Sequence, residues 1–223
     1  MRVMITVGTT AALLLVSSHG PAQEEPPLTT VDGWYRYGVP VPDMDGPVPR
    51  LANGRPDLSG QWKTQRRSDI TDDRIPGYVA ELPYTEWGQR QWDNYDPVND
   101  GDYAGSCLPF GWSRQVHGPR LTRFVHTEDM LVVLAEQNTW FHVIYLDGRP
   151  HDHNMYPTWW GDSVVHWEGD TLVVVTKNMN GYIKLDTEGH PISSQETFTQ
   201  TLRRINFGTI EHNFYVDDPK KYT

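Results

Sequence analysis

The second half of the chain alternates short apolar runs with polar links of two residues, and this pattern constrains the fold most. The clearest case runs from Asp162 to Glu168, through Gly169-Asp170, and on from Thr171 to Lys177. A Gly-Asp pair can adopt the positive φ values that match the twist of two antiparallel strands. The pattern therefore predicts a tight hairpin whose loop fixes the register. The predicted facing pairs are Trp167 with Leu172, His166 with Val173, and Val164 with Val175.

Further strands follow from the same kind of pattern. Short alternating runs bounded by polar residues predict strands at 58–63, 121–127, 130–136, 139–146, 198–206 and 209–216. Thr85 can cap one helix predicted at 84–94. About eight antiparallel strands joined by short links can close into a barrel that holds side chains or one small ligand. We expect an all-β, mainly antiparallel up-and-down β-barrel with one short helix, and an open two-sheet sandwich is the alternative.

The start of the chain has the three parts of a secretory signal peptide. Arg2 gives a positive start, an apolar run extends from Met4 to Val16, and Gly20-x-Ala22 offers a cleavage site. The apolar run has roughly 13 residues, whereas a membrane-spanning helix needs about 20. We expect residues 1–22 to be removed from a periplasmic or secreted protein without a stable membrane anchor. An uncleaved membrane helix is the alternative.

Residues 23–56 are rich in proline and lack periodicity. We interpret them as an extended arm wrapped on a single β domain at 57–223, because Trp34, Tyr35 and Tyr37 can pack against that domain. Plain disorder of the arm is the alternative.

Composition excludes some partners and favours others. The net charge is −10 and no run of Lys or Arg is present, so nucleic acid is a poor partner. Nine Trp and eleven Tyr suit the wall of a pocket for a small-molecule ligand or substrate. The lone Cys107 cannot form an internal disulfide. We expect its thiol to be buried, and a nucleophilic role assisted by Arg114 or His117 is the alternative.

The segment 145–170 carries the residues best suited to chemistry. It holds three His, four Asp, one Glu, one Arg and three Trp. Strand geometry puts Asp162, His166 and Glu168 on one face, and carboxylates beside an imidazole can orient it for proton transfer. The predicted catalytic residues are His151, Asp162, His166, Glu168 and Arg149. The predicted substrate-binding residues are Trp159, Trp160, Tyr145, His153, Trp140 and His142.

Simpler interpretations exist for several of these residues. Glu168 flanks the predicted turn, where acidic side chains are common because they are solvated. Arg149 can pair with Asp147 at the surface instead of binding a substrate anion. His151 and His153 could join Asp162 in a metal site, but no recognised metal-binding spacing is present. We therefore expect neither a metal nor a cofactor.

Three stretches resemble a family of uncharacterised exported bacterial proteins. They are Asn53-Gly-Arg-Pro-Asp-Leu-Ser-Gly-Gln-Trp62, Cys107-Leu-Pro-Phe-Gly111, and the series Asp147-Gly-Arg-Pro-His151, Trp159-Trp-Gly-Asp-Ser163 and Trp167-Glu-Gly-Asp-Thr-Leu-Val-Val174. The resemblance implies no activity. His166 stands where relatives often have Arg, and Trp112-Ser113 where they usually have a pair such as Met-Pro. The resemblance therefore shifts weight from His166 towards Arg149, His151, Asp162 and Glu168.

A shorter motif bears on the barrel. Gly60-Gln61-Trp62 resembles the Gly-x-Trp that opens lipocalin-type barrels. In such barrels an arginine from a late strand covers the tryptophan. The resemblance implies a lipocalin-like barrel in which Arg203 or Arg204 covers Trp62.

These observations lead to two hypotheses of function. The first is an exported enzyme that uses general acid/base catalysis, as an isomerase, lyase or hydrolase, on a cyclic or aromatic substrate in a barrel pocket. The second is a non-catalytic lipocalin-like binding protein that carries an apolar ligand.

Overall fold

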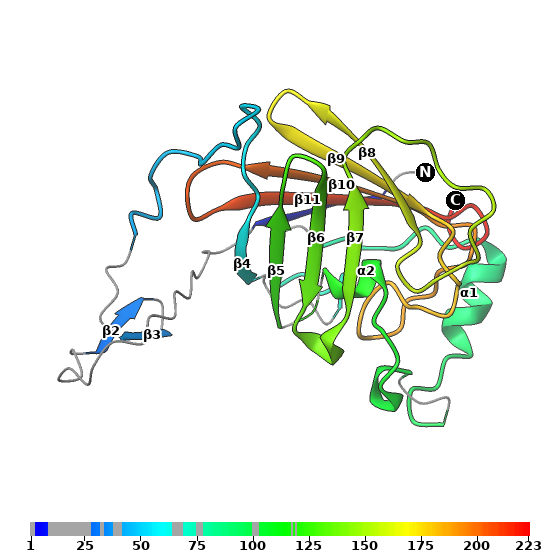
Figure 1. Cartoon of the computed structure of the whole chain (residues 1–223). Helices are drawn as coiled ribbons and strands as arrows, with labels where there is room; N and C mark the ends of the chain where they lie inside the picture. The colour runs from blue at the N-terminus through cyan, green and yellow to red at the C-terminus, as the bar shows by residue number, and fades with distance from the viewer. Residues whose placement is uncertain are drawn as a thin grey trace.

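Two antiparallel β-sheets dominate the computed structural model (Figure 1). The structure describes residues 3–8, 28–31, 34–37, 42–63, 69–74, 78–99, 103–116, 118 and 120–223. One sheet has the order β8-β9-β10-β11 and takes β1 as a fifth strand beside β11; the other has the order β4-β5-β6-β7. The mainly antiparallel β prediction is therefore confirmed. The strands are β1 (Val3–Gly8), β2 (Leu28–Val31), β3 (Trp34–Tyr37), β4 (Gly60–Lys63), β5 (Leu121–His126), β6 (Met130–Ala135), β7 (Phe141–Tyr145), β8 (Asp162–Glu168), β9 (Thr171–Lys177), β10 (Thr197–Arg204) and β11 (Ile210–Asp217).

The β8–β9 hairpin has the predicted loop and register. Gly169 adopts φ 61°, as the tight turn requires. The three predicted facing pairs, Trp167 with Leu172, His166 with Val173 and Val164 with Val175, are all present. This hairpin sets which side chains of β8 face the protein interior.

The helices of the described residues are short. Helix α1 (Glu86–Asp93) confirms the predicted helix, and the Thr85 hydroxyl accepts a hydrogen bond from the Gly88 backbone N–H at its start. Helix α2 (Trp112–Gln115) and two 3₁₀ turns, Tyr103–Ser106 and Gln137–Thr139, were not predicted. Each has at most four residues, too few to show a helical period. None of the helices in the described ranges is long and apolar enough to cross a membrane.

The core lies between the two sheets. Strand alternation turns one face of each sheet inward, so Phe198 and Phe214 from one sheet and Leu131 and Ile144 from the other are fully buried. The strands of the two sheets run in different directions, as Figure 1 shows.

Arg204 joins the two sheets at one end. Its guanidinium lies 5.1 Å from the centre of the Trp62 ring and donates a hydrogen bond to the Ser59 carbonyl oxygen at 3.2 Å. The predicted cover of Trp62 by a late arginine is thus confirmed for Arg204. In the described part of the chain no strand of one sheet pairs with a strand of the other. A closed barrel is therefore not confirmed.

The end of the N-terminal arm contacts two hairpin tips. Arg50 forms a bidentate pair with Asp170 in the β8–β9 turn, and the Phe207 N–H, near the β10–β11 turn, donates to the Gly46 carbonyl oxygen at 2.8 Å. Strands β2 and β3 pair with each other. Residues 9–22, with the predicted cleavage site, lie outside the described residues, and the signal peptide stays a prediction.

Candidate functional site

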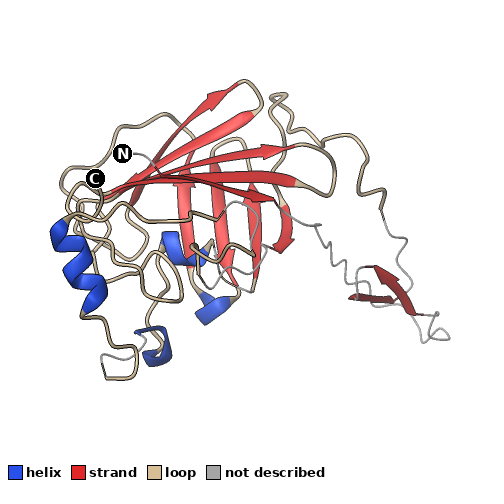
Figure 2. Ribbon diagram, turned by 180° about the vertical axis from the view of Figure 1, so that it is seen from behind, coloured by secondary structure: helices blue, strands red, loops and turns tan. Residues whose placement is uncertain are grey.

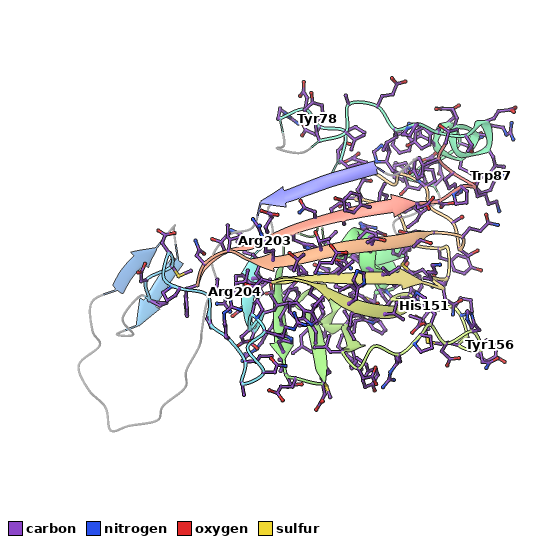
Figure 3. All side chains as sticks on the ribbon, turned by 90° about the horizontal axis from the view of Figure 1, so that it is seen from above. Tyr78, Trp87, His151, Tyr156, Arg203 and Arg204 are labelled. Carbon is purple, nitrogen blue, oxygen red and sulfur yellow. The ribbon has the colours of Figure 1, made fainter. Side chains whose placement is uncertain are left out.

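The candidate site lies at the end of the large sheet where β8 begins and β9 ends. Loop 146–161 reaches this end and carries His151, and the first residue of β8 is Asp162. Figure 3 shows His151 beside the start of β8, with Tyr156 farther out on the same loop. The loop returns to the sheet at Gly161, whose φ of +66° brings its backbone so close to the Lys177 carbonyl oxygen that a Cβ there would lie 2.3 Å from it. This turn fixes where Asp162 starts its strand.

His151 and Asp162 form the central pair of the site. His151 Nδ1 lies 2.8 Å from Asp162 Oδ2, and the same oxygen accepts the Asp152 backbone N–H at 2.9 Å. The two side chains are 20 % and 17 % exposed, so solvent reaches the pair from one side. Within the described part of the chain His151 Nε2 has no hydrogen-bond partner. The pair therefore holds one imidazole nitrogen, while the other is shielded from solvent and has no partner among the described residues.

A buried polar chain lies behind this pair. Ser163 follows Asp162 on β8 and faces inward, where its Oγ lies 2.9 Å from His142 Nε2 and 2.8 Å from Thr176 Oγ1. Burial lowers the pKa of His142 to about 4, against the opposing effect of the Asp162 charge. His142 is therefore neutral near pH 7.

Aromatic rings pack around His142. The Trp160 ring stacks on His142 with centroids 5.7 Å apart, and Trp112 meets both rings edge-on. Trp159 is half-buried and stacks on Tyr103 at 5.7 Å. His142 and Trp160, which were predicted to bind substrate, are buried core residues that pack behind the start of β8.

His166 and Glu168 lie away from this pair. His166 Nε2 is 3.1 Å from Glu168 Oε1, and both side chains are more than half exposed near the β8–β9 turn. Strand rise is about 3.3 Å per residue, so these side chains are more than 10 Å along the strand from Asp162. The structure does not bring His166 and Glu168 to the same place as His151.

Arg149 occupies a surface pair. Its guanidinium binds both oxygens of Asp147, at 2.6 Å for the shortest contact, and stacks on the Tyr145 ring at 3.8 Å. The hydrogen bonds to Arg149 lower the pKa of the Asp147 carboxyl. His153, Tyr145 and Trp140 are exposed. The contacts divide the predicted site residues into separate pairs, which are His151 with Asp162, His142 with Trp160, His166 with Glu168, and Arg149 with Tyr145.

The prediction for Cys107 was wrong. Its side chain is exposed rather than buried. Cys107 ends the 3₁₀ turn Tyr103–Ser106 in a left-handed conformation, with φ 61°, which turns the chain at the surface. His117, named as its possible base, lies outside the described residues.

Sequence reasoning missed the inward polar chain. Ser163 and Thr176 face each other in the predicted β8–β9 register, so their pairing followed from the hairpin. The contact between Ser163 and His142 joins the two sheets, and no local sequence pattern predicts it. The sequence also gave no sign that Trp112, on a four-residue helix, packs against both His142 and Trp160.

Comparisons with protein-family models, with curated proteins and with solved structures found no match for this chain.

Proposed function

We propose that this protein is a small-molecule enzyme that works by general acid/base catalysis, with His151 as the proton-transfer group and Asp162 as its orienting carboxylate. The observation that carries the proposal is the 2.8 Å contact between His151 Nδ1 and Asp162 Oδ2, combined with an unpartnered Nε2. A base held by a carboxylate through one nitrogen, with the other nitrogen free, is the arrangement that proton transfer needs.

The chemistry follows from the tautomer that Asp162 favours. A carboxylate accepts, so Nδ1 carries the proton and neutral His151 presents its lone pair on Nε2. A substrate proton can move to Nε2, and Asp162 then stabilises the imidazolium that forms. Such a group contributes about 10²–10⁴-fold to a rate. The chemistry fits an isomerase, lyase or hydrolase.

The substrate position is part of the proposal. The described cavity between the sheets, lined by Trp62, Phe124 and Leu202 among others, has a volume of about 30 Å³. That is room for water-sized molecules rather than for a cyclic or aromatic substrate. We therefore place the substrate outside this cavity, at His151 Nε2, which is shielded from solvent in this structure and must be uncovered for a substrate to reach it.

The lipocalin-like barrel and export remain part of the same proposal. Arg204 over Trp62 supports the barrel, because this contact joins the first strand of one sheet to a late strand of the other. The small cavity between the sheets gives less support to a carrier of an apolar ligand than the His151–Asp162 pair gives to an enzyme.

A substrate screen with matched variants tests the proposal. Wild-type protein is incubated with a panel of small cyclic and aromatic esters, lactones, enones and hydroxy acids, and turnover is followed by liquid chromatography and mass spectrometry. We expect His151→Gln to lower kcat/KM by about 10²-fold or more, and the exposed His166→Gln to leave it unchanged. Wild-type turnover by His151→Gln, or no turnover across the panel, would contradict the proposal.

A further inference from the structure

A second group of reactive side chains gathers away from His151. Asp69 comes from the segment between β4 and α1, and Asp186 and His190 come from the loop between β9 and β10. One ligand atom from each lies within 4.8 Å of the others. Asp186 is fully buried, His190 is 4 % exposed and Asp69 is half-buried. Segments far apart in the sequence thus bring two carboxylates and one imidazole together.

Asp186 fixes this arrangement before any ligand arrives. Its Oδ1 accepts the backbone N–H groups of Gly189 and His190, and its Oδ2 accepts the Ile70 N–H at 3.0 Å. Because Ile70 follows Asp69, the last bond ties the two segments to each other. His190 Nδ1 lies 2.6 Å from Asp186 Oδ2, and the Trp92 ring stacks on the imidazole at 4.3 Å. The imidazole is therefore held in one orientation.

Asp69 has one carboxylate oxygen that can coordinate a metal ion. Its Oδ1 accepts hydrogen bonds from the backbone N–H and the hydroxyl of Thr71. Among the described residues no hydrogen bond is made to Asp69 Oδ2, and this oxygen can serve as a ligand.

A buried hydroxyl near the cluster gives a separate sign of a missing partner. The Tyr84 hydroxyl oxygen is shielded from solvent and has no hydrogen-bond partner in the part of the chain that the structure describes. The Tyr84 ring stacks on the Tyr222 ring at 5.3 Å, and the Tyr222 hydroxyl donates to the carbonyl oxygen of Pro191, the residue after His190. Burial raises the pKa of Tyr84, and so do the charges of Asp186 and Asp69. A buried O–H without a partner is unfavourable, and a bound water or ion-held water would satisfy it.

An open acidic groove leads to the cluster. Asp69 lines it together with Asp72, Asp73 and Glu188, and its volume is about 720 Å³. The one arginine in its lining, Arg74, is paired with Asp72 at 2.7 Å. The groove therefore keeps a negative balance that raises the local concentration of cations.

We propose that Asp69, Asp186 and His190 bind a divalent first-row transition-metal ion, with water in the coordination positions that face the groove. The donor set selects the class of ion. Imidazole suits Zn²⁺ and similar ions, and carboxylates also suit Mn²⁺, whereas Ca²⁺ and Mg²⁺ prefer oxygen ligands throughout. An ion at Nδ1 takes the place of the proton that this nitrogen shares with Asp186, and His190 then carries its proton on Nε2. The site is separate from His151 and does not depend on the proposed acid/base function.

Metal titration of the untagged full chain tests this site. Protein treated with a chelator and dialysed is titrated with Zn²⁺ and with Mn²⁺ by calorimetry, and bound metal is counted by mass spectrometry. We expect saturable binding of a single ion per chain at micromolar concentration. Asp69→Asn and His190→Ala should weaken that binding by about 100-fold. The change in tryptophan fluorescence on binding should disappear in Trp92→Phe, because Trp92 stacks on the imidazole.

Matched controls separate this site from other causes. Asp73→Asn in the groove and His151→Ala in the other site should leave the affinity within a few-fold of wild type. The Asp69 side chain is half-buried and accepts hydrogen bonds only from Thr71 among the described residues, so Asp69→Asn decides the outcome if His190→Ala fails to fold. Full-affinity binding by Asp69→Asn, the absence of saturable binding in wild type, or Ca²⁺ binding as tightly as Zn²⁺ would each overturn the proposal.

Discussion

At the scale of single residues, burial shifts the pKa of several ionisable groups. Burial lowers the pKa of His212 to about 4, as it does for His142, so both imidazoles are neutral near pH 7. His212 Nε2 lies 2.9 Å from Gln200 Oε1. Both histidines face inward because their strand neighbours face out, a result that alternation along β7 and β11 predicts once the strands are known.

Glu196 is a buried carboxyl whose effect on stability depends on pH. Its side chain is 2 % exposed, and neither oxygen has a partner among the described residues. Burial raises its pKa well above 4.5, and the nearby Asp218 charge raises it further. Above pH 4.5 the unfolded chain releases this proton while the folded chain keeps it, so rising pH lowers the free energy of unfolding.

We predict that Glu196→Gln removes this decrease in the free energy of unfolding at rising pH. Its unfolding midpoint should match wild type at about pH 4 and exceed it increasingly towards about pH 8, because glutamine has no proton to release. Thermal unfolding followed by circular dichroism across this range checks the prediction. The exposed Glu168→Gln is the control and should follow the wild-type curve. Parallel curves for wild type and Glu196→Gln would contradict the protonated, buried state of Glu196.

At the scale of elements, the C-terminal segment packs against α1. The Thr85 N–H donates to the Lys221 carbonyl oxygen at 2.8 Å, and the Tyr222 ring stacks on Tyr84 at 5.3 Å. Gly88 lets the helix approach this segment, because a Cβ there would lie 2.1 Å from the Lys221 carbonyl oxygen. Figure 2 shows α1 beside the C-terminus.

Gly88→Ala should therefore push the C-terminal segment away from α1. We expect a loss of about 1–3 kcal/mol in the free energy of unfolding, as for other overpacked sites, despite the better helix propensity of alanine. Urea denaturation measures the loss. Gly105→Ala is the matched control, since nothing lies within 4 Å of a Cβ there. A Gly88→Ala variant as stable as Gly105→Ala would mean that the close contact is absent in solution.

At the scale of the whole molecule, Arg204 ties the two sheets together. It is 5 % exposed, covers Trp62, and donates to carbonyl oxygens beside β4 and at the β10–β11 turn. Its neighbour Arg203 faces outward and pairs with Glu211 at 3.2 Å. Figure 3 labels both arginines at this end of the sheet.

The two arginines should differ sharply when truncated. Arg204→Ala should lower the free energy of unfolding by about 3 kcal/mol or more, because several buried carbonyl oxygens lose their donor. Arg203→Ala should cost less than about 1 kcal/mol, as exposed ion pairs do. Chemical denaturation of the two variants checks this. Equal losses would refute the bridging role of Arg204.

Local sequence patterns predicted the strands and the helix of this molecule better than they predicted contacts between segments far apart in the sequence. The β8–β9 register followed from Gly169-Asp170 and strand alternation, and α1 from Thr85, because both depend on neighbouring residues. The contact between His151 and Asp162 could be predicted for the same reason, since a single loop joins the two residues. The cluster of Asp69 with His190 was not, because only tertiary packing brings their loops together.

The tautomer of His151 reports whether Asp162 orients this imidazole. Nitrogen-15 NMR of the neutral imidazole, assigned by comparison with His151→Gln, reports which nitrogen carries the proton. We predict a proton on Nδ1 and a free lone pair on Nε2, with the preference lost in Asp162→Asn and kept in Glu168→Gln. A neutral His151 protonated on Nε2, or one that is indifferent to Asp162→Asn, would contradict the claim that Asp162 orients this imidazole for proton transfer.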